Sequence, residues 1–337
     1  MSNPQTTMAD VAARAGVSIA TASRALSNAT GVAAATRLHV RKVAEELAYV
    51  VSPEASRLAG GATRRVAVVV PHVSRWFFGE LVEGIEAVVR DADLDLLLYQ
   101  VGDARDRHNF FERLPARKKV DAVVVVGFQL SQAEQERLEL MGVHIVSAGD
   151  QHRDYPSVCI DDAAAGAQAM DHLLFLGHRR IGMIATFDPD QPVAPTGRSS
   201  AYYTALEKAG IKADPELVVN VNWGALEGAT AMDRFLSIKD PPTAVYVHTD
   251  EVAIGALRSL RRAGLKVPQD ISVIGIDDHP MAELNDLTTI HQSPRRQGSA
   301  AAHMVLELLR GEPRPAAVTL PTHLVIRAST SPPRPGS

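Results

Sequence analysis

The first fifty residues repeat apolar positions with the spacing of short α-helices. Gly16 is a suitable C-terminal stop for the first helix, Ser18 is a favourable N-cap for the second, and Tyr49 follows the third. Three sets of apolar residues would share one small core: Met8, Val11, Ala12 and Ala15; Ala22, Ala25 and Leu26; and Val40, Val43, Ala44 and Leu47. Two short helices joined by a glycine-containing turn, supported by a third, form a helix-turn-helix. We therefore predict such a headpiece over residues 6–51.

The segment SPEASRLAGG, residues 52–61, has the signals of one very short helix. Serine suits the N-cap, proline the first helical position and an acid the first turn, and two glycines follow. A helix this short does not overcome the cost of nucleation alone, so we expect it to fold only against a partner surface. In that case Leu58 is an apolar residue able to wedge into a DNA minor groove. The alternative is a plain linker.

From Val66 onward, short apolar runs alternate with amphipathic helical stretches. The runs are rich in Val and Ile and bounded by Gly, Pro or Asp: VAVVVP, DLLLYQ, DAVVVVG, VHIVSAG, RIGMIA, TAVYVHT and ISVIGID. Alternating strands and helices indicate parallel sheets covered on both faces. The segment is long for a single sheet of this kind, so we predict a two-lobed α/β core with two doubly wound parallel sheets.

Charge is distributed unevenly along the 337 residues, 46% of which are hydrophobic. The formal net charge of −4 would by itself argue against nucleic acid as a partner. However, the chain through Arg65 has eight basic and four acidic residues, whereas the remainder has 27 basic and 35 acidic. A basic headpiece of +4 on an acidic body of −8 favours a separate polyanion-binding domain.

The sequence has few signals of export, membrane insertion or enzymatic chemistry. Cys159 is the single cysteine, the N-terminus lacks a secretory pattern, and no apolar run approaches the ~18 residues that span a bilayer. Phosphate-loop, dinucleotide, nucleophile-elbow and zinc-protease motifs are absent, and the 12 histidines are scattered. We expect a soluble cytoplasmic protein that is not an enzyme and has no membrane partner, cofactor or metal. His178 is expected to be structural.

The second helix carries side chains suited to DNA. Its outward positions have small or hydroxyl groups that can enter a major groove, and Arg24 can bind guanine O6 and N7 with its planar fork. Short polar residues near helix starts commonly hold phosphates; here they are Thr7, Ser18, Asn28 and Thr36. The alternative is a three-helix cap whose second helix is merely solvated.

The order of three motifs resembles the headpiece and hinge of the lactose/galactose repressor (LacI/GalR) family of bacterial transcription regulators. These motifs are TMADVAARAGVSIATASRALSN, GVAAATRLHVRKVAEELAYV and SRLAGG. The resemblance implies that the second helix reads bases and that the hinge helix inserts a leucine into a palindromic operator. By position, the base-facing residues would be Ile19, Ala20 and Arg24; the phosphate contacts Thr7, Ser18, Thr21, Ser23, Asn28 and Thr36; and the wedge Leu58, flanked by Ala55 and Ala59.

The sequence departs from the family pattern at three headpiece positions. Ala33 stands where a serine usually caps the third helix, which by ordinary cap energetics costs about 1 kcal/mol. Gly31 replaces a more often polar residue. Ala20 offers a base pair only a methyl group, so the operator preference of a relative cannot be transferred to this chain.

The body resembles the effector-binding core of the same family through GHRRIGMIA, DEVAIGALRSLRRAGLKVPQDISVIGIDD and LTTIHQ. The resemblance implies a core over 64–330, itself similar to periplasmic sugar-binding proteins, with a ligand in the cleft between lobes. Lobe one would comprise about 64–161 and 293–318, and lobe two about 162–292 and 319–330. We expect a disordered tail at 331–337.

Candidate effector contacts lie where open α/β sheets bind ligands, at the carboxyl ends of strands. Asp277, His248 and Asp250 end two runs, Arg198 opens a helix, and Trp223 lies in a loop. Carboxylates and arginine can bind vicinal hydroxyls, and a flat ring can cover a sugar face. Asp250 is better explained as a helix cap or turn residue. With the family carry-over, the expected contacts are Phe77, Phe78, Asp150, Arg198, Trp223, His248 and Asp277.

We therefore expect a sequence-specific DNA-binding repressor that binds a palindromic operator as a homodimer and is controlled by a sugar or sugar derivative. The nearest alternative is a nucleobase- or other metabolite-responsive regulator with the same architecture. An alternative of a different class is a cytoplasmic sugar-binding protein, or an enzyme that uses Asp277, Asp250 and His248 on a bound sugar. Reversible binding without turnover would exclude the enzyme.

Overall fold

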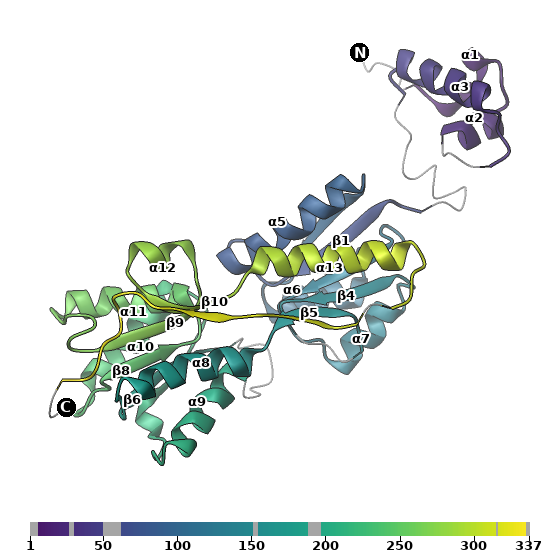
Figure 1. The fold of residues 1–337 in the computed structure, drawn as a ribbon. Coiled ribbons are helices and arrows are strands. Elements are labelled where there is room, and N and C mark those ends of the chain that lie inside the picture. Colours follow the sequence, from purple (N-terminus) through teal and green to yellow (C-terminus); the bar gives the residue numbers. More distant parts are fainter. Residues whose placement is uncertain are drawn as a thin grey trace. The chain divides into compact units, whose positions relative to one another are not determined.

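The computed structural model describes residues 6–26, 30–49, 62–150, 154–187, 197–314 and 316–334. The chain divides into two units, Met1–Arg65 with Lys118–Asp121, and Val66–Arg117 with Ala122–Ser337 (Figure 1). The predicted separation between a small helical unit and a large α/β unit is therefore present in the structure.

The first unit contains the three predicted helices: α1 (Met8–Ala15), α2 (Ile19–Leu26) and α3 (Ala34–Glu46). Their apolar faces enclose a common core around Val11, Ala22 and Val40, against which Tyr49 packs. Gly16 ends α1 with a φ of 65°, in the left-handed region that glycine adopts without a steric penalty. The local spacing and the stop signals thus predicted this unit correctly.

Local side chains determine where the helices of the first unit begin. Thr7 and Asp10 form a capping box at α1, and Ser18 accepts a hydrogen bond from the Thr21 amide at the start of α2, with an N···O distance of 3.1 Å. Ala33 at the N-cap of α3 makes no side-chain cap bond. As expected, Ala33 therefore gives the third helix no side-chain cap.

The first sheet of the large unit has the strand order β11-β5-β4-β3-β1-β2. Its strands are β1 (Arg65–Val70), β2 (Asp95–Gln100), β3 (Ala122–Val126), β4 (His144–Ala148), β5 (Ser157–Ile160) and β11 (Val318–Leu320). Its helices are α5 (Trp76–Asp91), α6 (Ala104–Arg113), α7 (Gln132–Glu139) and α13 (Pro294–Leu309). We call this sheet with its helices the first lobe. The pairs β1–β3, β3–β4, β4–β5 and β5–β11 are parallel.

Helices α5 and α13 lie side by side over the first sheet (Figure 1). Gly84 of α5 faces the Arg295 backbone, and Gly298 of α13 faces the Leu81 backbone. A Cβ at either glycine would lie well inside van der Waals contact with a carbonyl oxygen. The two glycines therefore permit the close approach of these helices, which cover the core formed by residues such as Leu81, Ile85 and Ala301.

The second sheet has the order β12-β10-β9-β8-β6-β7. Its strands are β6 (Ile181–Thr186), β7 (Val218–Val221), β8 (Ala244–Val247), β9 (Ser272–Asp277), β10 (Thr288–His291) and β12 (His323–Val325). Its helices are α8 (Asp162–Phe175), α9 (Gly197–Lys208), the 3₁₀ helix η1 (Pro215–Leu217), α10 (Ala225–Ser237), α11 (Asp250–Arg262) and α12 (Pro280–Leu284). We call these elements the second lobe. Edge strand β12 is antiparallel to β10, whereas the other pairs are parallel.

The chain passes between the two lobes three times: from β5 to α8, from β10 to α13 and from β11 to β12. The last passage lies between Leu320 and His323. Multiple passages mean that each lobe is built from segments far apart in sequence. A movement of one lobe relative to the other must therefore be accommodated by all three connections.

The expectation of a disordered tail at 331–337 is wrong for residues 331–334. The Ser331 carbonyl oxygen lies 2.8 Å from His178 Nε2, and Arg334 pairs with Asp270 at 2.6 Å. His178 is buried, and its Nδ1 lies 2.9 Å from the Thr243 hydroxyl, which agrees with its expected structural role. A proline-rich composition predicted disorder, but backbone acceptors in this segment satisfy buried donors of the second lobe.

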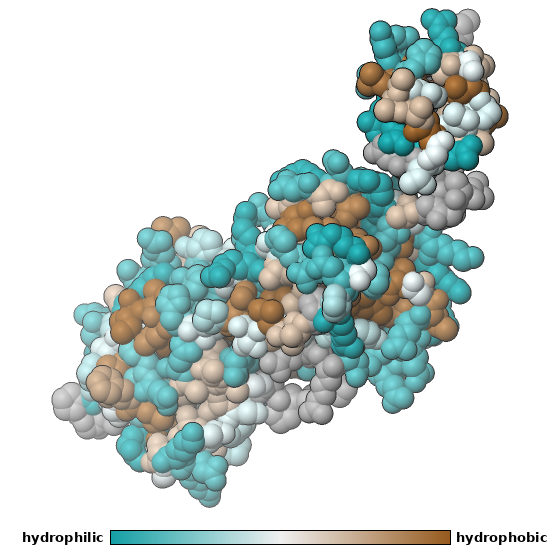
Figure 2. Space-filling view, turned by 45° about the vertical axis from the view of Figure 1, so that its right-hand side comes forward, coloured by the Kyte–Doolittle hydropathy of each residue, from teal (hydrophilic) through white to brown (hydrophobic). Residues whose placement is uncertain are grey.

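On the face drawn in Figure 2, hydrophilic residues cover much of the large unit and hydrophobic groups are interspersed among them. Among the helices within the described ranges, none is long and apolar enough to cross a membrane.

Candidate nucleic-acid interface and effector site

The outward face of α2 carries most of the residues predicted to contact DNA. Ser18, Ile19, Ala20 and Arg24 are exposed, with 56% of Ile19 accessible, whereas Ala22 and Ala25 of the same helix are buried. Thr21 and Ser23 are half-buried, as is Thr36 in α3. An exposed isoleucine beside an alanine gives α2 an apolar, low-profile surface that suits contact with a thymine methyl group.

Local hydrogen bonds orient the polar groups of this face. Arg24 Nε donates to the Ala20 carbonyl oxygen at 3.2 Å, which holds the guanidinium along the helix. The Ser18 and Thr21 hydroxyl oxygens are 2.8 Å apart. Thr7 donates from its hydroxyl to Asp10 at 2.7 Å, and hydrogen bonds from Thr7 lower the pKa of Asp10. Capping accounts for both Thr7 and Ser18, so a phosphate contact would be an additional role.

Four predicted DNA contacts lie outside the described residues. They are Asn28 and the three hinge positions Ala55, Leu58 and Ala59. Their assignment therefore rests on the sequence alone.

Arg198, one of the predicted effector contacts, is held by two carboxylates of the second lobe. Its Nε donates to Asp162 at 2.7 Å, and its Nη1 lies 3.7 Å from Asp277. Nη1 also donates to the His248 carbonyl oxygen. Burial alone would lower the pKa of Arg198, but Asp162 and Asp277 raise it above its ordinary value. The structure thus brings together Arg198, His248 and Asp277, which lie far apart in sequence.

Asp277 is held in an unusual backbone conformation at the end of β9. Its φ is 131° and that of Asp278 is 55°, so two successive non-glycine residues lie in the positive-φ region. Backbone strain of this kind is found where a site requires a particular side-chain direction. Gln292 donates to the Asp277 carboxylate at 2.7 Å and in turn accepts from Gln297 at 2.9 Å. This chain of amides orients the carboxylate.

Asp250 lies completely buried beside Asp277. It accepts from the Thr289 hydroxyl at 2.8 Å and from the His279 amide at 2.9 Å. Burial raises the pKa of both Asp250 and Asp277, and for Asp277 the Arg198 charge and the Gln292 hydrogen bond act in the opposite direction. Of these two carboxyl groups, Asp277 is therefore the one that more readily stays ionised. The interpretation of Asp250 as a helix cap is wrong, because Thr249 caps α11 by accepting from the Val252 amide.

His248 follows β8 directly and is 1% exposed. The Thr186 amide donates to its Nδ1 at 3.3 Å. Among the described residues, Nε2 of His248 has no hydrogen-bond partner. Burial, and then the Arg198 charge, lower the pKa of His248 to about 3. The ring is neutral at physiological pH.

The aromatic candidates come from both lobes. Phe78 and Trp223 meet edge to face across the lobes, with ring centroids 6.2 Å apart. Phe78 is 3% exposed and belongs to the core of the first lobe, so its predicted effector role is better explained by packing. Phe77 is half-buried and lies close to Gly149, the residue before Asp150. Phe77, Trp223 and Asp150 thus remain candidates at the facing ends of the two lobes.

Sequence reasoning missed three residues that organise this region. Arg75 donates to the Trp223 carbonyl oxygen at 2.6 Å and pairs with Glu251 at 3.5 Å, and Gln292 binds Asp277. Arg75 precedes the predicted Phe77, Glu251 follows Asp250, and Gln292 ends the motif LTTIHQ. Their proximity to predicted residues was the available signal, but their partners lie in other segments of the chain.

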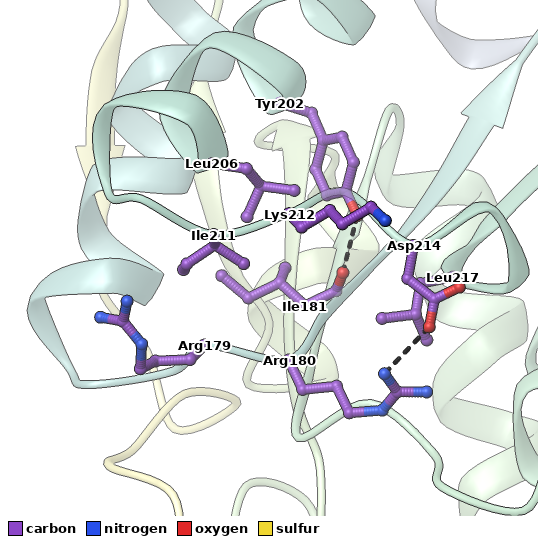
Figure 3. Close-up of a pocket in the computed structure, with 9 residues that line it drawn as sticks. All are labelled: Arg179, Arg180, Ile181, Tyr202, Leu206, Ile211, Lys212, Asp214 and Leu217. Atoms are coloured by element: carbon purple, nitrogen blue, oxygen red, sulfur yellow. Dashed lines mark hydrogen bonds and ion pairs between the residues drawn. The ribbon is translucent and has the colours of Figure 1, made fainter.

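A cavity of about 180 Å³ lies elsewhere in the second lobe, between α9 and the amino end of β6 (Figure 3). Tyr202 at its wall donates to the Ile181 carbonyl oxygen, and Arg180 at its rim pairs with Asp214 at 3.0 Å. Its volume is below the 300 Å³ or more of ordinary ligand sites. The cavity is at the amino end of β6, and Arg180 and Tyr202 at its wall already have partners within the protein. The cluster at the carboxyl ends of the strands is therefore the better candidate for the effector site.

Within the described part of the chain, no group of three potential metal-binding His, Cys, Asp or Glu side chains is present.

A small three-helix unit followed by two α/β lobes, with a strained carboxylate at the strand ends of the second lobe, is the architecture of one class of protein: ligand-responsive transcription regulators with a periplasmic-binding-protein-like core. Residues 7–52 match the model of the bacterial regulatory proteins of the lacI family, and residues 170–330 match that of the periplasmic binding protein-like domain. The chain belongs to the LacI family of bacterial transcription regulators.

Similar proteins support this assignment along almost the whole chain. The HTH-type transcriptional repressor CytR of Escherichia coli K12 is 33% identical over 329 residues, covering 96% of each chain. The solved Lac repressor dimer bound to operator and the anti-inducer ONPF has a TM-score of 0.84 at 26% identity, covering 97% of this chain and 99% of that one. A complex of the transcriptional regulator CelR with cellobiose has a TM-score of 0.70 at 29% identity, covering 96% and 100%.

Proposed function

We propose that this protein is a transcription repressor that binds a palindromic operator as a homodimer and is controlled by a small molecule bound between its lobes. The observation that carries the proposal is the exposed face of α2, with Ile19, Ala20 and Arg24 on a helix whose opposite side is buried. Membership of the LacI family supports operator binding, and the Lac repressor dimer on its operator provides the model for the assembly. One headpiece would read each half-site, so a two-fold dimer matches a palindrome.

The DNA contacts that we propose separate base readers from phosphate binders. Arg24 would bind guanine, while Ile19 and Ala20 would contact the edges of neighbouring bases. Leu58, between Ala55 and Ala59, would wedge into the minor groove at the centre of the operator. Phosphate contacts would come from the hydroxyl and amide side chains of Thr7, Ser18, Thr21, Ser23, Asn28 and Thr36.

The effector would bind where Arg198, Asp277 and His248 meet, with Phe77, Trp223 and Asp150 at the same ends of the lobes. A sugar is the first candidate because carboxylate and guanidinium groups bind vicinal hydroxyls and an aromatic ring covers the apolar face of a sugar. A nucleobase-containing effector is the second candidate, since the Trp223 ring also suits a flat base. The binding of cellobiose by CelR supports the first candidate.

Control would operate through the relative position of the two lobes. An effector that favours one lobe arrangement changes the separation of the two hinge segments in a dimer, and with it the stability of their helices on DNA. Coupling of about 1–3 kcal/mol changes operator affinity by roughly 5- to 150-fold. Arg75, which joins the lobes through Trp223 and Glu251, is placed to respond to such a movement.

Selection from a pool of random duplexes by the full-length protein tests the DNA-binding proposal. We expect enrichment of an inverted repeat at moderate ionic strength. The R24A variant should bind that repeat about 10- to 100-fold more weakly and lose discrimination at one symmetric base pair, because a bidentate pair contributes about 1–3 kcal/mol. R90A, at an exposed position of α5, is the matched control. Failure of the wild-type protein to prefer any inverted repeat would contradict the proposal.

A further inference from the structure

His248 has one hydrogen-bonding atom with a partner and one without. Its Nδ1 accepts from the Thr186 amide, so in the neutral ring the proton resides on Nε2. That N–H is buried, and among the described residues it has no acceptor. Buried donors in folded proteins are almost always satisfied, so a donor that no described residue satisfies, at the carboxyl ends of neighbouring strands β6, β8 and β9, is suited to an acceptor atom of a bound ligand.

The positive charge beside this donor is already paired with carboxylates. Arg198 is the described cation in contact with His248, and it binds both Asp162 and Asp277. Glu251 also lies near Asp277 but is paired with Arg75, and burial favours the neutral form of Asp250. A ligand carrying a phosphate or carboxylate would therefore meet no uncommitted cation in the Arg198 cluster, and burial of its charge would be costly.

The Asp277 carboxylate has its own requirement. One oxygen accepts from Gln292, and the strained backbone and the Gln292–Gln297 pair hold it in place. An ionised carboxylate has several acceptor positions and no donor, so beside Gln292 and Arg198 it can also accept from N–H or O–H groups of a ligand. The site therefore offers acceptors at Asp277 and a donor at His248, without a surplus of positive charge.

We infer that the effector is an uncharged molecule that donates hydrogen bonds to Asp277 and accepts one from His248 Nε2. Unphosphorylated polyhydroxy compounds and nucleosides have this chemistry, whereas sugar phosphates and nucleotides do not. The inference rests on the proposed effector site and makes His248 a residue that determines ligand specificity.

Calorimetric titration of the full-length protein with matched pairs tests the charge requirement. The probes are ribose and ribose 5-phosphate, glucose and glucose 6-phosphate, and cytidine and adenosine with their 5′-monophosphates. We expect at least one neutral compound to bind, with a Kd at least tenfold below that of its phosphate. A phosphate ester that binds as tightly as its neutral partner, or more tightly, overturns the inference. If no compound of either kind binds while operator DNA still does, the proposed effector control itself fails.

Variants of His248 test the donor, with the neutral compound from that titration as probe. H248L removes the N–H, and we expect its Kd to rise tenfold or more; H248Q keeps an amide donor and should recover part of the loss. H172L changes a half-buried histidine of the same lobe that contacts Thr330, and should leave the Kd unchanged. Binding capacity for operator measures the folded fraction of each sample. A folded H248L with wild-type ligand affinity overturns the role of His248.

Discussion

Arg75 of the first lobe donates a hydrogen bond to the carbonyl oxygen of Trp223 in the second lobe, at a distance of 2.6 Å. The same guanidinium pairs with Glu251, and Glu251 accepts from the Trp76 amide at 3.4 Å. Arg75 is the N-cap of α5 and makes no side-chain cap bond of its own. Glu251 therefore supplies an acceptor from the other lobe to the amino end of α5, where a negative charge is favourable.

Replacement of Arg75 by alanine should weaken the contact between the lobes. We expect R75A to lower the free energy of unfolding by about 1–2 kcal/mol, because it removes a charged hydrogen bond and a partly exposed ion pair. Urea denaturation measures this loss. The control is R90A, since Arg90 pairs with Glu86 within α5 and forms no ion pair with another segment among the residues that the structure describes; its effect should stay below about 0.5 kcal/mol. Equal effects of the two substitutions would show that the Arg75 contact does not stabilise the core.

Introduction of a serine at position 33 should stabilise the headpiece. Ala33 is the N-cap of α3 and leaves the first-turn amides without a side-chain acceptor. A33S should increase the stability of the headpiece by about 1 kcal/mol. Hydrogen exchange of the α3 amides in the full-length protein measures this gain. A35S places the same side chain at an exposed position inside α3, where it should lower helix stability slightly. A gain with A35S but not with A33S would contradict the capping explanation.

A methyl group at Gly298 should disrupt the packing of α13 on α5. Its Cβ would meet the Leu81 carbonyl oxygen, and neither backbone can move freely. We expect G298A to reduce stability by about 1–3 kcal/mol through overpacking, visible as a lower midpoint of urea unfolding. At Gly79 of α5 a Cβ would lie 3.8 Å from the nearest atom, the Val73 carbonyl oxygen. G79A should therefore be neutral or stabilising. A stable G298A protein would show that the two helices can separate without loss.

Acidification should destabilise the wild-type core partly through His248. Its folded-state pKa of about 3 is below the ordinary 6.5, so the folded state binds fewer protons between these values. The stability associated with the neutral ring is therefore complete above pH 6.5 and is lost as the pH falls below it, by about 1.4 kcal/mol per pH unit.

The variant H248Q lacks this titration. Between pH 7.5 and pH 5, wild-type stability should fall by about 2 kcal/mol more than that of H248Q, as measured by denaturant unfolding at each pH. H303Q, at an exposed histidine of α13, is the control and should follow the wild type. Parallel pH profiles for the wild type and H248Q would contradict the burial of a neutral ring.

Removal of the Trp223 ring should separate effector response from DNA binding. Trp223 contacts Phe78 across the lobes and contributes its carbonyl oxygen, which any residue supplies, to Arg75. W223A should raise the effector concentration needed for half-maximal change in operator binding by about tenfold, the equivalent of 1.4 kcal/mol. Its operator affinity without effector should stay close to that of the wild type. Equal loss of both, measured by fluorescence anisotropy, would indicate that Trp223 acts by packing alone.

The successful sequence predictions concern contacts between near neighbours. Helices α1 and α2 follow from apolar spacing and from caps such as Thr7 and Ser18, whose partners lie three residues away. The α/β core follows from strand-length apolar runs. Asp277 and His248 could be proposed because a strand end is visible in the sequence.

The tail and Asp250 show where the same reasoning fails. Composition predicted a disordered tail at 331–337, but Ser331 binds His178, 153 residues away. Asp250 follows a predicted strand, which suggested a helix cap or turn residue, yet its partners are Thr289 and the His279 amide. In both cases the deciding contact is made by another strand or loop of the second lobe.

The order of residues along the chain thus determined the elements, their caps and the family to which the protein belongs, because these depend on short-range spacing. The tertiary structure decided which distant residues come into contact: Arg75 with Trp223, 148 residues apart, and Arg198 with Asp277. It also decided that His248 lies buried with one nitrogen lacking a described partner. The physical reason is that burial and charge pairing arise between segments brought together by the order of strands in the sheets, which no local pattern specifies.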